Sequence, residues 1–149
     1  MPSLATGIET ARPQVTAELM ARTGLDEGIL TDLVHRFYAK VRADAILGPI
    51  FKARISDWGL HLQRMVAFWS SVALLTGRYH GAPMPAHATL PVTQAHFERW
   101  LVLFRETANS VCPPEGAALV IERAERIARS LHMAVEDFAH REGRMPMLR

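Results

Sequence analysis

The sequence predicts an all-α protein, and three observations indicate this class. Apolar residues recur at intervals of three and four along four long stretches, which is the period of an amphipathic helix. The nine prolines, which helix interiors exclude, punctuate these stretches. No segment alternates polar and apolar residues as a half-buried strand does. The four stretches therefore predict four long helices packed around a common core.

The first two long helices carry the most informative polar residues. Between Pro13 and Pro49 a helix ends at Gly48-Pro49 and has an apolar face comprising Leu30, Leu33, Val34, Phe37, Tyr38 and Val41. A second helix spans about 57–76, with Ser56 or Asp57 as cap and Gly77 as stop. Its apolar stripe contains Trp58, His61, Leu62, Met65, Phe68, Trp69 and Val72. Tyr38 and His61 should therefore point inward.

Residues 77–92 contain two glycines and three prolines, so they predict a loop, and His87 lies within it. Thr93 is the expected N-cap of a third helix whose inward face includes Phe97 and Trp100. A fourth helix starts at Pro113-Pro114 and runs to about Arg141. We expect a shorter helix over 15–22 and loose tails at 1–12 and 143–149. His35, His96, His132 and His140 are expected at the surface.

Composition excludes several classes of protein. A length of 149 residues suits one domain, which we place at 26–142, between a partly flexible extension (1–25) and a tail (143–149). The net charge of +2 comes without a run of basic residues, so no nucleic-acid partner is implied. The longest apolar run, 65–75, is too short to span a bilayer, and residues 1–12 do not read as an export signal. A single cysteine, Cys112, excludes an intramolecular disulfide and suits the cytoplasm; we expect it to be unreactive.

Five segments together resemble a known family, the third group of truncated haemoglobins. They are residues 37–42, 47–51, 61–69, 77–91 and 97–101, and the similarity extends over roughly residues 28 to 140. Each segment alone is a weak signal, but their order and their aromatic positions are specific. The glycine-pair motifs of other truncated haemoglobins are absent, which favours the third group. The resemblance implies a globin-like sandwich of two helix pairs, two over two, around a haem.

The resemblance also implies a role for each residue of a haem site. His87 would ligate the iron of haem b on the proximal side, and a neutral imidazole is the common ligand there. Tyr38, His61 and Trp100 would line the distal pocket, and Phe51 would stack on the porphyrin. Arg64 could reach a haem propionate, because a guanidinium pairs well with a carboxylate. The remaining residues implied to contact the cofactor are Phe37, Met65, Phe68, Tyr79 and Leu90.

The expected distal residues suggest what such a haem protein does. Dioxygen at a five-coordinate haem carries partial negative charge, so the Tyr38 hydroxyl and the Trp100 indole would stabilise it, and carbon monoxide much less. Hydrogen bonds to charged groups contribute about 1.5 to 3 kcal/mol each, so two donors would slow oxygen release by roughly two to four powers of ten. Such slow release is unsuited to bulk transport. We expect redox chemistry instead, either oxidation of nitric oxide to nitrate or a peroxidase-like reaction with peroxide, supported by an unidentified reductase.

Other interpretations of the same residues stay open. Without the resemblance, a histidine on an apolar stripe is more often a hydrogen-bonded core residue than a ligand. His61 could donate to a ligand, bind iron or gate access to the pocket. The protein could also be a haem-based sensor. A helical module that binds zinc through His80, His87 and His96 is a further alternative, although their spacing matches no common zinc motif.

Overall fold

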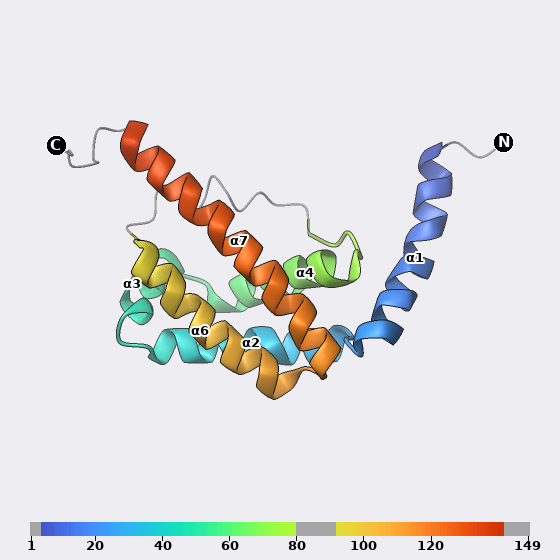
Figure 1. Cartoon of the computed structure of the whole chain (residues 1–149), viewed down its shortest axis with the longest axis horizontal. Coiled ribbons are helices and arrows are strands. Elements are labelled where there is room, and N and C mark those ends of the chain that lie inside the picture. The colour runs from blue at the N-terminus through green and yellow to red at the C-terminus, as the bar shows by residue number, and fades with distance from the viewer. Residues whose placement is uncertain (1–3, 80–91, 142–149) are drawn as a thin grey trace.

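The computed structural model describes residues 4–79 and 92–141, and in these residues it contains six α-helices and no β-strand (Figure 1). The all-α class is therefore confirmed. His87 and Leu90, the proximal ligand and one cofactor contact expected from the sequence, lie outside the described residues. The helices are α1 (Leu4–Thr23), α2 (Glu27–Ala43), α3 (Leu47–Arg54), α4 (Trp58–Leu74), α6 (Gln94–Val111) and α7 (Pro114–Arg141).

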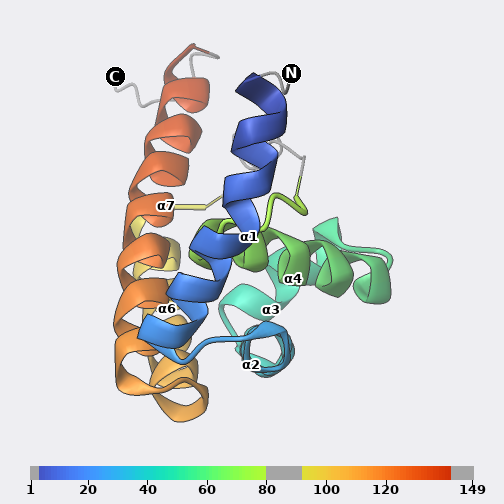
Figure 2. The same ribbon diagram turned by 90° about the vertical axis from the view of Figure 1, so that its right-hand side faces the viewer.

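Helices α2, α4, α6 and α7 form two pairs that cross. Helix α6 packs along α7, and α2 packs against both α4 and α6. In Figure 2, α6 and α7 stand on one side of the molecule, and α2 and α4 lie on the other. The short α3 contacts α2 and α6, and α1 contacts α4 and α7. The arrangement is the two-over-two helical sandwich that the resemblance implied.

Capping residues fix where the long helices begin, as expected. The Asp57 carboxylate accepts a hydrogen bond from the Leu60 backbone amide at 3.0 Å, which satisfies a free donor in the first turn of α4. Helix α6 starts directly after Thr93, and α7 covers Pro114 to Arg141, both as predicted. Helix α4 ends at Leu74, earlier than the expected stop at Gly77, because Leu75 already has a left-handed backbone with φ of 58°.

Two boundaries differ from the sequence prediction. Gly48-Pro49 does not end α2, which stops at Ala43; both residues lie in the first turn of α3. Proline is compatible with that position, since the first amides of a helix have no intrahelical acceptor. Helix α1 begins at Leu4 and contains Pro13, whereas we expected a helix only over 15–22. The Thr16 hydroxyl donates to the Leu74 carbonyl at 2.6 Å, and this bond holds α1 against the end of α4.

The core lies where α2 crosses α4 and α6. All six residues predicted for the apolar face of α2 are at most 6% exposed, and Phe37 is at its centre. The Phe37 ring meets the rings of Tyr38, Trp100 and Phe104 edge to face, at centroid distances of 5.0 to 5.3 Å. This geometry is the favoured one for aromatic pairs. Contacts with Phe37 thereby hold the Tyr38 and Trp100 side chains in place.

Candidate functional site

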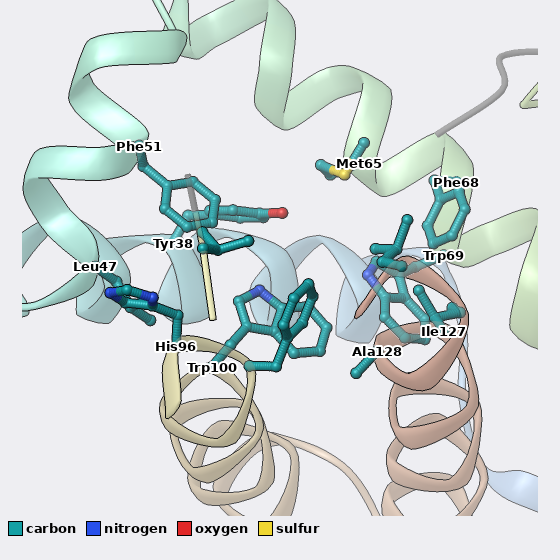
Figure 3. A pocket seen from close by; sticks show the side chains of 13 residues that line it. Tyr38, Leu47, Phe51, Met65, Phe68, Trp69, His96, Trp100, Ile127 and Ala128 are labelled. Atoms are coloured by element: carbon teal, nitrogen blue, oxygen red, sulfur yellow. The ribbon is translucent and has the colours of Figure 1, made fainter. Parts of the chain in front are cut away.

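A cavity opens between the two helix pairs, and all five helices from α2 to α7 contribute to its wall (Figure 3). It encloses about 780 Å³ of space free of atoms, part of which is open to solvent. Cofactor and ligand sites have mostly apolar walls with a few polar groups among them. The wall is formed by Tyr38, Leu47, Phe51, Met65, Phe68, Trp69, Val92, His96, Phe97, Trp100, Ile127, Ala128 and Leu131.

Tyr38 brings the main hydrogen-bonding group of α2 into this apolar cavity. Its side chain is 6% exposed, and Figure 3 shows the phenol oxygen directed into the cavity. Burial raises the pKa of the Tyr38 hydroxyl well above its ordinary value of 10, because the phenolate would lose its hydration. The hydroxyl therefore stays protonated at any physiological pH. It can donate a hydrogen bond to a polar or anionic molecule in the cavity.

Trp100 contributes a second donor from α6, and a stack of rings holds it in place. Its indole lies parallel to the Phe104 ring, with centroids 5.5 Å apart and an interplanar angle of 13°. Phe104 in turn stacks on Trp69 at 5.0 Å, and Phe37 closes the group edge to face. The indole N–H is a donor only. Tyr38 and Trp100 therefore place two potential donors on the wall of one cavity.

His61 lies beside Tyr38 but is not among the side chains that line the cavity in the described part of the chain. The imidazole is half-buried, as its place on the apolar stripe of α4 predicted. It meets the Tyr38 ring edge to face at 4.9 Å and the Trp58 ring edge to face at 5.7 Å. His61, Tyr38 and Trp58 thus form one cluster of rings. The role of His61 in the distal pocket stays a prediction.

A buried carboxylate connects the α2–α3 turn to α6. The Asp44 side chain is 6% exposed and accepts hydrogen bonds from the Leu47 amide at 2.9 Å and the Ile46 amide at 3.1 Å. Arg99 donates to the same carboxylate through Nε at 2.8 Å, and its Nη2 forms an ion pair with that carboxylate, also at 2.8 Å. The amide of Leu47 and the other donors lower the pKa of Asp44 against the opposing effect of burial. Since Arg99 precedes Trp100, this contact fixes α3 relative to the indole.

The other residues implied by the resemblance occupy different positions. Phe51, Met65 and Phe68 line the cavity. Tyr79 contacts Phe68 edge to face at 5.1 Å, and Arg64 is exposed on α4. Phe37 lies behind the wall, where it supports Tyr38 and Trp100. The structure thus brings Tyr38, Trp100, Phe51, Met65 and Phe68 together around one space.

Two histidines expected at the surface are partly buried. His96 lines the cavity, and its Nδ1 accepts a hydrogen bond from the Thr93 amide at 2.9 Å, so the ring caps the start of α6. His132 lies 5.2 Å from the Phe97 ring, and its side chain is 21% exposed. The expectation was therefore wrong for these two residues, whereas His35 and His140 are exposed. The position of His96 three residues after Thr93 was the available signal, because a side chain at that position can reach back to the cap.

Residues from α7 and α3 also line the cavity without having been predicted. They are Leu47, Ile127, Ala128 and Leu131, together with Trp69, Val92 and Phe97 from other segments. All are apolar or aromatic, so nothing in the sequence distinguishes them from ordinary core residues. Only the packing of α7 against α6 and α4 directs Ile127, Ala128 and Leu131 to this space.

The described residues contain no group of three or more histidine, cysteine or acidic side chains that could hold a metal ion. His80 and His87, two of the three ligands of the zinc alternative, lie outside the described residues, so the structure does not test that alternative. Within the described chain, no helix combines the length and the apolar character required to cross a bilayer.

The helical sandwich and its internal cavity define a globin. The family described as bacterial-like globin matches residues 19–132, which include every helix from α2 to α6 and most of α7. This match covers the residues that line the cavity. Globins bind haem and small gaseous ligands, and that class of function follows from the family.

Two comparisons identify the group within this family. The chain is 37% identical over 109 residues to the Group 3 truncated hemoglobin ctb of Campylobacter jejuni, covering 70% of this chain and 86% of that protein. The crystal structure of the group III truncated hemoglobin from Campylobacter jejuni is similar with a TM-score of 0.70 and 34% identity, covering 74% of this chain and 91% of the other. The chain belongs to the bacterial-like globins and, among them, to the third group of truncated haemoglobins.

The cavity fits the cofactor of this family. A porphyrin is flat, large and apolar except for its carboxylates, so it requires aromatic and aliphatic walls on both faces. Met65 and Phe68 of α4 lie on one side of the cavity, and Trp100 of α6 lies on another (Figure 3). Phe51 extends toward Tyr38 at the α3 end, with ring centroids 6.1 Å apart. The residues present are therefore compatible with haem.

Proposed function

We propose that this globin binds haem b with His87 as the iron ligand and uses Tyr38 and Trp100 to hold dioxygen for redox chemistry. The observation that carries the proposal is the Tyr38 hydroxyl, which is buried, protonated and directed into an apolar cavity that Trp100 also lines. A donor in such surroundings stabilises a partly anionic ligand strongly, because water does not compete with it. A protein that releases dioxygen slowly is suited to converting it and not to carrying it.

Haem, when bound, would supply an iron that binds dioxygen and that provides the one electron needed to combine dioxygen and nitric oxide into nitrate. The residues of this chain orient the reactants. The Tyr38 hydroxyl and the Trp100 indole donate to dioxygen, and the apolar side chains of Met65 and Phe68 exclude water. Because each turnover oxidises the iron by one electron, an electron donor must reduce it again, so we propose a reductase partner. We place the reaction in the cytoplasm, where the single thiol, Cys112, stays reduced.

The assignment of His87 rests on the family and on the proline-rich segment that contains it. Replacement His87→Gly should remove the protein ligand and leave space for exogenous imidazole. We expect the variant to lose the five-coordinate spectrum of the reconstituted protein and to regain it when imidazole is added. An unchanged spectrum in His87→Gly without imidazole would contradict the assignment.

The reaction itself is tested by stopped-flow mixing of the oxygen-loaded ferrous protein with nitric oxide, and of the ferric protein with peroxide. Fast, stoichiometric formation of nitrate supports dioxygenation of nitric oxide, and a fast reaction with peroxide alone supports a peroxidase-like activity. Slow reactions with both would refute the redox proposal and favour storage or sensing.

A further inference from the structure

Three side chains outside the cavity wall form a continuous contact that ends on Tyr38. The Arg42 guanidinium, in the last turn of α2, lies over the Trp58 ring at 4.4 Å from its centroid. Trp58 meets His61, one turn later on α4, edge to face at 5.7 Å. His61 meets Tyr38 edge to face at 4.9 Å. The order of contacts is therefore Arg42, Trp58, His61 and Tyr38, and it joins α2 to the start of α4.

Each contact in this series has a favourable geometry. The interplanar angle is 84° between Trp58 and His61 and 86° between His61 and Tyr38, and nearly perpendicular rings are the preferred arrangement. A guanidinium within about 6 Å of an indole centroid is attracted by the ring. Trp58 is also close to Tyr38, at 6.1 Å between centroids. The imidazole therefore contacts two rings that are also neighbours of each other, and its departure would cost both contacts.

We propose that Trp58, braced by Arg42, is a positioning residue that keeps His61 packed against Tyr38 and out of the cavity. The ligand then meets the hydroxyl of Tyr38 and the indole of Trp100, and the imidazole of His61 does not occupy the space beside the iron. Trp58 and Arg42 touch no ligand in this arrangement; they act through His61. The part of this inference that concerns the iron rests on the proposed function, but the position of His61 does not.

The position of His61 is tested first in the full-length chain without haem. Nuclear Overhauser effects between the ring protons of His61 and Tyr38 report the distance between the two rings. The ring current of Trp58 changes the chemical shifts of these protons but does not change that distance. We expect strong effects in the unmodified chain and at least a severalfold loss of their intensity in Trp58→Leu. The conservative Trp58→Phe should restore most of the intensity. Full intensity in Trp58→Leu would overturn the proposal.

Arg42→Gln is the second variant, because it removes the charge and keeps most of the stem. It should raise the population of displaced His61 about two- to fivefold, the factor that an exposed cation–π contact is worth. Arg36→Gln is the matched control on the same helix, since Arg36 is exposed and pairs only with Asp32 at 3.4 Å among the described residues. Equal effects of Arg42→Gln and Arg36→Gln would contradict a specific brace.

The consequence for the cofactor is tested by reconstitution with hemin. In Trp58→Leu the released His61 should reach the iron, and we expect the low-spin, six-coordinate fraction of the ferric spectrum to rise about two- to tenfold. The double variant Trp58→Leu/His61→Leu should return the spectrum to that of the unmodified protein. A spectrum unaffected by Trp58→Leu would overturn the proposal. If the chain takes up no hemin, the proposed function fails, while the ring-proton measurement still decides the position of His61.

Discussion

Removal of the Tyr38 hydroxyl group has an effect that can be calculated. Phenylalanine fills the same space, so Tyr38→Phe should leave the cavity intact and change the free energy of unfolding by less than about 1.5 kcal/mol. The variant loses one donor to dioxygen. A hydrogen bond to a charged acceptor contributes about 1.5 to 3 kcal/mol, so dioxygen should dissociate roughly 10- to 150-fold faster. Burial of the Tyr38 side chain, which is 6% exposed, places the value toward the upper end of this range.

The assay is stopped-flow dissociation of dioxygen from the reconstituted ferrous protein, with carbon monoxide as the matched ligand. Carbon monoxide carries little charge and gains little from a hydrogen-bond donor. Its dissociation rate should therefore change less than about threefold, which corresponds to a free-energy difference below about 0.7 kcal/mol. An unchanged oxygen dissociation rate would refute the role of Tyr38. Equal acceleration of both ligands would show that the substitution disturbed the cavity and that the hydrogen bond was not responsible.

Three further predictions concern stability and reactivity. The pKa of Asp44 is lower in the folded state, so its carboxylate stabilises the fold above the ordinary pKa of about 4. This stabilisation is lost as the pH falls through the folded-state pKa. Thermal unfolding of Asp44→Asn should therefore be less sensitive to acid than that of the unmodified protein. Burial raises the pKa of Cys112 to about 11, so alkylation should be slow at pH 7 and accelerate about tenfold per pH unit up to pH 10. Gly116→Ala places a Cβ 2.7 Å from Leu25 and should destabilise the fold by about 1 to 3 kcal/mol in urea unfolding, whereas Gly59→Ala, whose nearest contact is at 3.6 Å, should not.

Helix starts are well predicted from this sequence, because single side chains determine them. Asp57, Thr93 and Pro114 each mark the first turn of a helix, and each acts within three or four residues of its own position. Local chemistry was also misleading at one point. Gly48-Pro49 is a common helix stop, but Asp44 already ends α2 by accepting from two amides of the next turn. The proline then falls in the first turn of α3, where it is tolerated.

The hydrogen-bond donors Tyr38 and Trp100 could be predicted from the sequence, whereas most of the residues that form the cavity wall could not. Tyr38 and Trp100 lie on clear apolar faces, and a hydroxyl or an indole on such a face requires an acceptor. The packing of His61 against Tyr38 depends on contacts with Trp58 and with α2, which periodicity along α4 does not reveal. The contribution of α7 to the wall depends on how whole helices cross, so Ala128 cannot be recognised from its own neighbours.

The most direct test of the account is titration of the purified chain with hemin, followed by the Soret band and by tryptophan fluorescence. Trp69 and Trp100 line the cavity, so a haem bound there should quench their emission as the Soret band develops. We predict saturation of both signals at one hemin per chain, and loss of saturable binding in Ala128→Trp, which places an indole in the cavity from its α7 wall. A Soret band that develops without quenching, or binding that Ala128→Trp leaves unchanged, would contradict the placement of haem between the two helix pairs.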